Sequence, residues 1–84
     1  MINNLNSPSE IRIIDIITLE QSDLCLQIYL KHMLRGSLAH QELLTYFENT
    51  PEIMEKLKKH GLLPVYFAYF LEFAIMSTLL PTPS

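Results

Sequence analysis

The C-terminal stretch Leu62 to Leu80 constrains this chain most, because its nineteen residues carry a single formal charge, that of Glu72. Five of the chain's eight aromatic residues lie between Tyr66 and Phe73. When the stretch is drawn as a helix, the residues around Glu72 are apolar too, so no side of the helix is polar. A helix of this kind is either buried on every side or lies in lipid.

A membrane anchor is the first hypothesis that this stretch raises. Nineteen residues can cross a bilayer, and Lys58 and Lys59 shortly before them favour a cytoplasmic N-terminal side. Against a span, a charge near the middle costs about 2.5–3.5 kcal/mol on insertion, and Tyr66 and Tyr69 lie inside the stretch instead of at its ends. We therefore keep a tail-anchored or membrane-associated protein, with residues 62–80 in the bilayer, as the alternative to a helix packed inside a small domain.

Length and composition favour a small domain with apolar surface to spare. A chain of 84 residues forms one domain at most, and its core is thin. Apolar residues make up 49% of the chain and charged residues only 18%, so we expect some apolar surface to remain uncovered. The formal net charge of −3 argues against binding to nucleic acid, which requires clustered Lys and Arg.

The cysteine content and the N-terminal sequence predict a cytoplasmic protein. Cys25 is the only cysteine, which excludes an internal disulfide and suits a reducing compartment. The first ten residues, MINNLNSPSE, lack the cationic end and apolar run of a secretory signal.

Capping residues divide the middle of the chain into helices. A capping box at Thr18–Gln21 begins the first helix, which continues to Leu34 and ends at Gly36. Ser37 is predicted to cap a second helix that runs to Asn49. Three further signals complete the pattern: Thr50 and Pro51 begin a third helix, Gly61 ends it, and Pro64 and Pro81 bound the last one.

Residues 11–17 fit neither a helix nor a strand cleanly. Ile11 and Ile13 on either side of Arg12 alternate as in a strand, and the segment is rich in β-branched isoleucine. A strand here has no evident partner in the chain, so it would have to pair with another chain.

The predicted fold is therefore all-α, a single helical domain over residues 1–84. We expect a bundle of four short helices, or five if residues 11–17 add one, with the apolar C-terminal helix at its centre. Residues 1–9 form a polar segment that we expect to be frayed, and residues 81–84 form a tail.

The residues that a metal site or a catalytic thiol would use are Cys25, His32, His40 and His60. Zinc sites typically use closely spaced ligand pairs, and the sequence contains none. Cys25 falls in the apolar stripe of its predicted helix, where a thiol packs as a small hydrophobe with a high pKa. Both glycines are assigned to helix ends, which leaves no glycine-rich phosphate loop. We expect no metal, no cofactor and no enzymatic activity.

A helix-turn-helix is the third hypothesis, because the predicted helices at 37–49 and 51–60 are joined by a tight turn. Recognition helices touch DNA mainly through their first turns, and here those turns carry Glu52 and Glu55, which repel phosphate. A DNA-binding regulator is therefore the least favoured of the three.

The favoured hypothesis is a protein–protein interaction module: an adaptor, inhibitor or assembly factor that binds itself, as a homodimer, or a larger protein. Three short helices can hardly cover the whole circumference of the last helix, so a second chain would cover the remainder. Residues 11–17 are a further candidate for this contact. Glu72 would then need a hydrogen-bond donor, for example the Tyr69 hydroxyl of the other chain. The predicted interface residues are Val65, Tyr66, Tyr69, Phe70, Glu72, Phe73 and Met76. The competing interpretation is that these residues are ordinary core.

Overall fold

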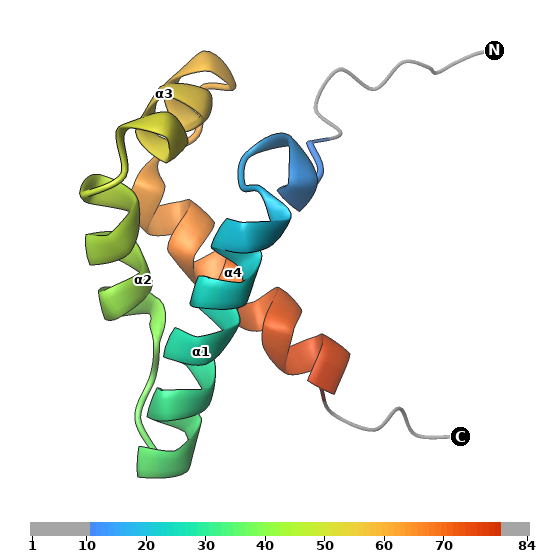
Figure 1. Cartoon of the computed structure of the whole chain (residues 1–84), viewed down its shortest axis with the longest axis vertical. Helices are drawn as coiled ribbons and strands as arrows, with labels where there is room; N and C mark the ends of the chain where they lie inside the picture. The colour runs from blue at the N-terminus through green and yellow to red at the C-terminus, as the bar shows by residue number, and fades with distance from the viewer. Residues whose placement is uncertain (1–10, 80–84) are drawn as a thin grey trace, which may run out of the picture.

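The computed structural model describes residues 11–79, and it is helical throughout apart from connecting turns (Figure 1). A short 3-10 turn, η1 (Ile13–Asp15), precedes four α-helices: α1 (Leu19–Arg35), α2 (His40–Glu48), α3 (Pro51–Lys59) and α4 (Pro64–Leu79). The predicted all-α fold and the four helices are confirmed. The expected polar segment at 1–9 and the tail at 81–84 lie outside the described residues.

Residues 11–17 form a turn, and the strand alternative is wrong for them. The turn satisfies its own backbone, because Asp15 N donates to Arg12 O at 2.9 Å and the Asp15 carboxylate accepts from Arg12 N at 2.9 Å. Ile16 and Ile17 then point into the core, where both are buried. Local hydrogen bonding and burial together override the β-preference of isoleucine.

Most helix ends lie where the sequence predicts them. The Thr18 hydroxyl accepts from Gln21 N at 3.1 Å, and the Gln21 side chain accepts from Thr18 N at 2.9 Å, which is the predicted capping box. Gly36 ends α1 with a φ of 73°, a left-handed conformation that glycine adopts without steric cost. Pro51 and Pro64 each occupy the first position of a helix.

The predicted start of the second helix is wrong, because the capping position falls on Ala39 and not on Ser37. The Ser37 hydroxyl lies 2.9 Å from Nδ1 of His32 instead. Helix α2 begins at His40, and the side chain of Ala39 accepts no hydrogen bond. The hydrogen-bond acceptor at the N-terminal end of α2 is instead a side chain of α4.

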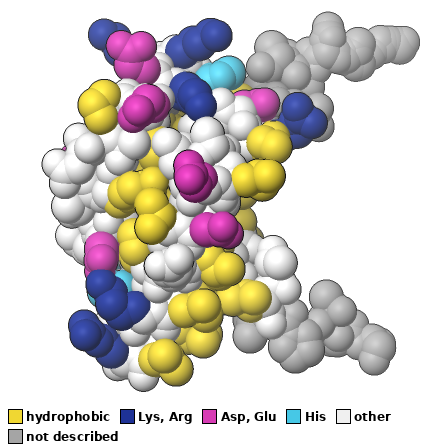
Figure 2. All heavy atoms as spheres, viewed as in Figure 1, with side chains coloured by type: hydrophobic (Ala, Val, Ile, Leu, Met, Phe, Trp, Pro, Cys, Tyr) yellow, Lys and Arg dark blue, Asp and Glu magenta, His cyan; other side chains and the backbone are white. Residues whose placement is uncertain are grey.

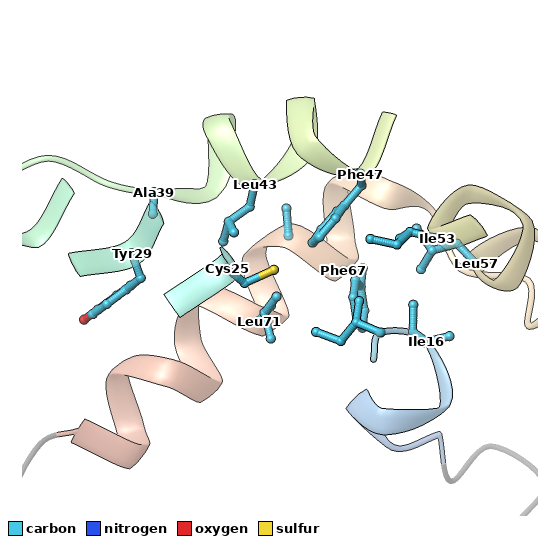
Figure 3. Close-up of a cluster of buried hydrophobic side chains, with 12 residues drawn as sticks. Ile16, Cys25, Tyr29, Ala39, Leu43, Phe47, Ile53, Leu57, Phe67 and Leu71 are labelled. Carbon is cyan, nitrogen blue, oxygen red and sulfur yellow. The ribbon is translucent and has the colours of Figure 1, made fainter. Parts of the chain in front are cut away.

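The core lies where α1, α2, α3 and α4 meet the residues that follow η1 (Figure 3). Phe47 of α2 and Phe67 of α4 point toward each other, with ring centroids 5.4 Å apart. Ile53 and Leu57 extend this cluster from α3, and Ile16 covers it from the other side. Helix α4 contacts both α1 and α2, which agrees with its predicted central position.

None of the helices in the described part of the chain is both long and apolar enough to cross a membrane alone. Helices α3 and α4 satisfy that length and composition only when taken as a pair, and the two are bent by 99° with respect to each other.

Candidate functional site

Helix α4 has one buried face and one exposed face. The buried face consists of Phe67, Ala68, Leu71 and Glu72. The opposite face carries four large aromatic side chains with helical spacing, which we call the aromatic strip: Tyr66 (66% exposed), Tyr69 (51%), Phe70 (51%) and Phe73 (66%). Because the only formal charge of α4 is on the buried face, the exposed face of this helix is uncharged.

The structure groups most of the predicted interface residues. Tyr66, Tyr69, Phe70 and Phe73 form the strip, and Val65 lies at its margin with 38% of its surface exposed. Met76 is partly buried and packs against the core. Glu72 faces the other way and is only 6% exposed, so it contributes nothing to this surface.

Glu72 holds the N-terminal end of α2. One carboxylate oxygen, Oε2, accepts a hydrogen bond from Ala39 N at 2.6 Å, and the other, Oε1, lies 3.0 Å from Nδ1 of His40. Since an ionised carboxylate only accepts, Nδ1 of His40 donates in this contact when that nitrogen carries the proton. The first N–H groups of a helix have no partner within it and carry partial positive charge, which a carboxylate offsets. The donor that Glu72 requires therefore comes from its own chain, not from a tyrosine of a second chain.

No sequence signal pointed to this contact. Glu72 is 33 residues from Ala39, and alanine is a poor capping residue, so local motifs placed the helix start at Ser37. A lone carboxylate in an apolar helix does indicate that a buried donor exists, but it does not identify the donor.

The two central rings of the strip rest on ordered neighbours. The Tyr69 ring stacks on His40, with centroids 4.2 Å apart and an interplanar angle of 25°. Phe70 lies against the buried Phe67, at a centroid distance of 6.3 Å. Since Glu72 contacts His40 in turn, the Tyr69 ring rests on a side chain that is itself held in place, and the Phe70 ring rests on the core. Preorganised side chains lose less conformational entropy on binding.

Exposed apolar side chains also occur outside the strip. Residues 11–79 contain 14 exposed large hydrophobics against 12 buried hydrophobic residues, so the expected apolar surplus is present. Figure 2 shows hydrophobic side chains along the face that carries α1, down to the end of that helix. The exposed large hydrophobic residues toward the end of α1 and in the loop that follows it are Leu30, Met33, Leu34 and Leu38. Leu38 directly precedes Ala39, whose backbone N–H donates to Glu72 of α4.

The four residues considered for metal binding or catalysis do not converge. Cys25 is in the core, where burial raises the pKa of its thiol to about 12. His32 contacts Ser37 and Glu42, His40 contacts Glu72, and His60 is exposed after α3. Within the region the structure describes, no three His, Cys, Asp or Glu side chains are grouped as metal ligands.

Glu42 connects α2 to α1 through a contact that we expect to be sensitive to acid. Its carboxylate accepts from Lys31 Nζ at 2.7 Å and lies 2.7 Å from His32 Nε2. These hydrogen bonds lower the pKa of Glu42 from its ordinary value of 4.5, and the one from Lys31 has the larger effect. The folded state thus favours the ionised form. Its stabilising effect is complete above pH 4.5 and is lost as the pH falls through the lowered folded pKa.

We therefore expect Glu42→Gln to lower the melting temperature slightly at pH 7, since the contact is exposed to solvent. The difference from the wild type should shrink as the pH falls below 4.5 through the lowered pKa of folded Glu42, because wild-type Glu42 then also becomes protonated. Thermal melts followed by circular dichroism between pH 3 and pH 7 measure this. A difference that stays constant over the range would show that ionisation of Glu42 contributes nothing.

The aromatic strip is thus the most distinctive surface in residues 11–79: four large rings on one uncharged helix face, with the central pair supported by His40 and Phe67. Comparison of the chain with protein-family models, with curated proteins and with solved structures finds no match.

Proposed function

We propose that this protein is a small, non-enzymatic protein-interaction module that binds through the aromatic strip, and that it associates with itself through this surface. The observation that carries the proposal is the exposure of Tyr66, Tyr69, Phe70 and Phe73 on a single uncharged face. Aromatic residues are enriched in the contact regions of protein interfaces and supply much of their affinity. The role as adaptor, inhibitor or assembly factor belongs to this same class of function.

The area of the strip bears on the strength of self-association. A free aromatic side chain presents about 150–250 Å², so four that are half to two-thirds exposed present roughly 450 Å². A stable interface needs about 800 Å² from each partner. Leu63, which directly precedes the first residue of α4 and is 57% exposed, adds apolar surface at that end of the helix. We therefore expect a weak dimer, with a dissociation constant in the micromolar range.

Charge supports a second copy as the partner. Two copies can bring their strips together without burying a charge, because the exposed face of α4 has none. Burying an unpaired charge would cost several kcal/mol, so its absence leaves the apolar gain undiminished.

The test compares strip residues with a residue elsewhere that is at least as exposed. We expect the double variant Tyr66→Ser, Phe73→Ser to weaken self-association by about tenfold or more, since large rings that become buried dominate interface energies. The control is Leu19→Ser on α1, which is 77% exposed and outside the strip, and it should associate as the wild type does. Light scattering behind a sizing column measures the mass, and circular dichroism checks that each variant is folded. Equal masses for the double variant and the wild type would contradict the proposal.

A further inference from the structure

We infer that the second copy lies antiparallel to the first, α4 against α4, with a two-fold axis passing between Tyr69 and Phe70. This inference rests on the proposed self-association and adds its orientation and register. It follows from the symmetry of the strip, from the pairing of the rings, and from the charges at one end of α4.

The strip is symmetric about the midpoint of Tyr69 and Phe70. Tyr66 lies three residues before Tyr69, and Phe73 lies three residues after Phe70. Exposure follows the same symmetry, with 66% at the two outer rings and 51% at the two inner rings. In a two-fold contact the same surface is used by both copies, so a surface that is symmetric along its helix fits its own reverse.

The antiparallel register pairs unlike rings in the two outer layers. Tyr66 of each chain lies opposite Phe73 of the other, whereas Tyr69 and Phe70 flank the two-fold axis and each lies about 1.5 Å along the helix axis from its own copy. Each outer layer then has one tyrosine, whose hydroxyl can reach solvent at the rim, and one phenylalanine. A parallel pair would instead place tyrosine against tyrosine and phenylalanine against phenylalanine. Buried tyrosine hydroxyls need partners, so the mixed layers are the better arrangement.

Charge at the start of α4 favours the same orientation. The last turn of α3, which precedes Pro64 by a short loop, carries Lys56, Lys58 and Lys59. A parallel pair would bring these two clusters to the same end, whereas an antiparallel pair places them at opposite ends of the contact. Antiparallel helices also align their dipoles favourably.

Single-cysteine variants of the full chain distinguish the two orientations. In the antiparallel register, the two Phe70 residues of the dimer are displaced from each other by about 1.5 Å along the helix axis, and the two Tyr66 residues by about 10 Å. Disulfides need Cα atoms about 4.4–6.8 Å apart. Under mild oxidation, we expect Phe70→Cys to give about ten times more disulfide-linked dimer than Tyr66→Cys, and an equal mixture of Tyr66→Cys and Phe73→Cys to form the mixed dimer. The buried Cys25, with its raised pKa, does not compete.

A second measurement leaves the strip intact. Ser77 is exposed, one turn beyond Phe73, and its cysteine variant can carry a nitroxide spin label. In the antiparallel register the two labelled positions are displaced along the axis by about 22 Å, whereas in a parallel pair they face each other directly. Pulsed electron spin resonance should therefore give a mean separation above about 20 Å.

The outcomes separate this inference from the proposed function. If the wild type has the monomer mass at every concentration, both fail. If it is a dimer in which Tyr66→Cys forms disulfides as readily as Phe70→Cys and the Ser77 labels are close together, only the antiparallel orientation fails. If the wild type is a dimer but no cysteine placed in the strip forms more disulfide-linked dimer than it does in urea, the strip is not the contact surface. Both the antiparallel orientation and the proposed function then fail.

Discussion

The Phe47→Ala variant is expected to be largely unfolded at 25 °C. Phe47 has no solvent-exposed surface, and its ring packs against Phe67 at 5.4 Å in the centre of the core. Truncating a buried phenylalanine to alanine typically costs about 3–5 kcal/mol, through lost burial and the cavity that remains. A single core in a chain of this size supplies only about 3–5 kcal/mol of net stability. The loss is therefore comparable to the whole free energy of unfolding.

The matched control is Phe73→Ala, the same chemical change on a residue that is 66% exposed. This variant should keep the helical circular dichroism signal of the wild type, because little burial is lost within one chain. Urea titration followed at 222 nm measures both variants. If Phe47→Ala and Phe73→Ala unfolded at the same urea concentration, the assignment of one ring to the core and the other to the surface would be wrong.

The second large effect is expected at Glu72. Glu72→Ala leaves Ala39 N buried without an acceptor and removes the partner of His40. An unsatisfied buried donor costs about 1–3 kcal/mol, and loss of a helix N-cap about 0.5–2 kcal/mol. Since these terms overlap, we expect a loss of about 2–3 kcal/mol, which lowers the melting temperature of so small a domain by roughly 10–20 °C.

Glu72→Gln is the control for shape, because glutamine keeps one acceptor oxygen for Ala39 N and nearly the same volume. It should lose less than half as much stability as Glu72→Ala and should still self-associate, since Glu72 is not on the strip. Differential scanning calorimetry of the three proteins measures the difference. A melting temperature of Glu72→Ala within about 3 °C of the wild type would show that the carboxylate does not stabilise α2.

The part of the fold that depends on neighbouring residues could be predicted from the sequence. The Thr18 box, the glycine at position 36 and the prolines at 51 and 64 act within one helical turn, so their effects appear in local sequence. The prediction at Ser37 is wrong because this hydroxyl contacts Nδ1 of the His32 ring and donates to the His32 backbone carbonyl, instead of capping the following helix. The true start of α2 depends on a residue 33 positions away, which no local rule detects.

The composition of the candidate site could be predicted, but its orientation could not. A helix that is apolar on all sides has no polar face to indicate which side meets solvent, so nothing in the sequence separates Phe67 from Phe70. The structure separates them through Phe47, which packs on Phe67 and leaves Phe70 51% exposed. The sequence places Glu72 in the predicted interface because the helix offers it no polar face, and the fold turns it inward.

The mass of the wild-type chain as a function of concentration tests whether the aromatic strip joins two copies. Sedimentation equilibrium from about 1 to about 200 µM covers the range expected for a contact of this area. We predict a weight-average mass that rises from 9.8 kDa toward twice that value, with a midpoint in the micromolar range. A folded chain whose mass remains 9.8 kDa at the highest concentration would contradict self-association through the strip.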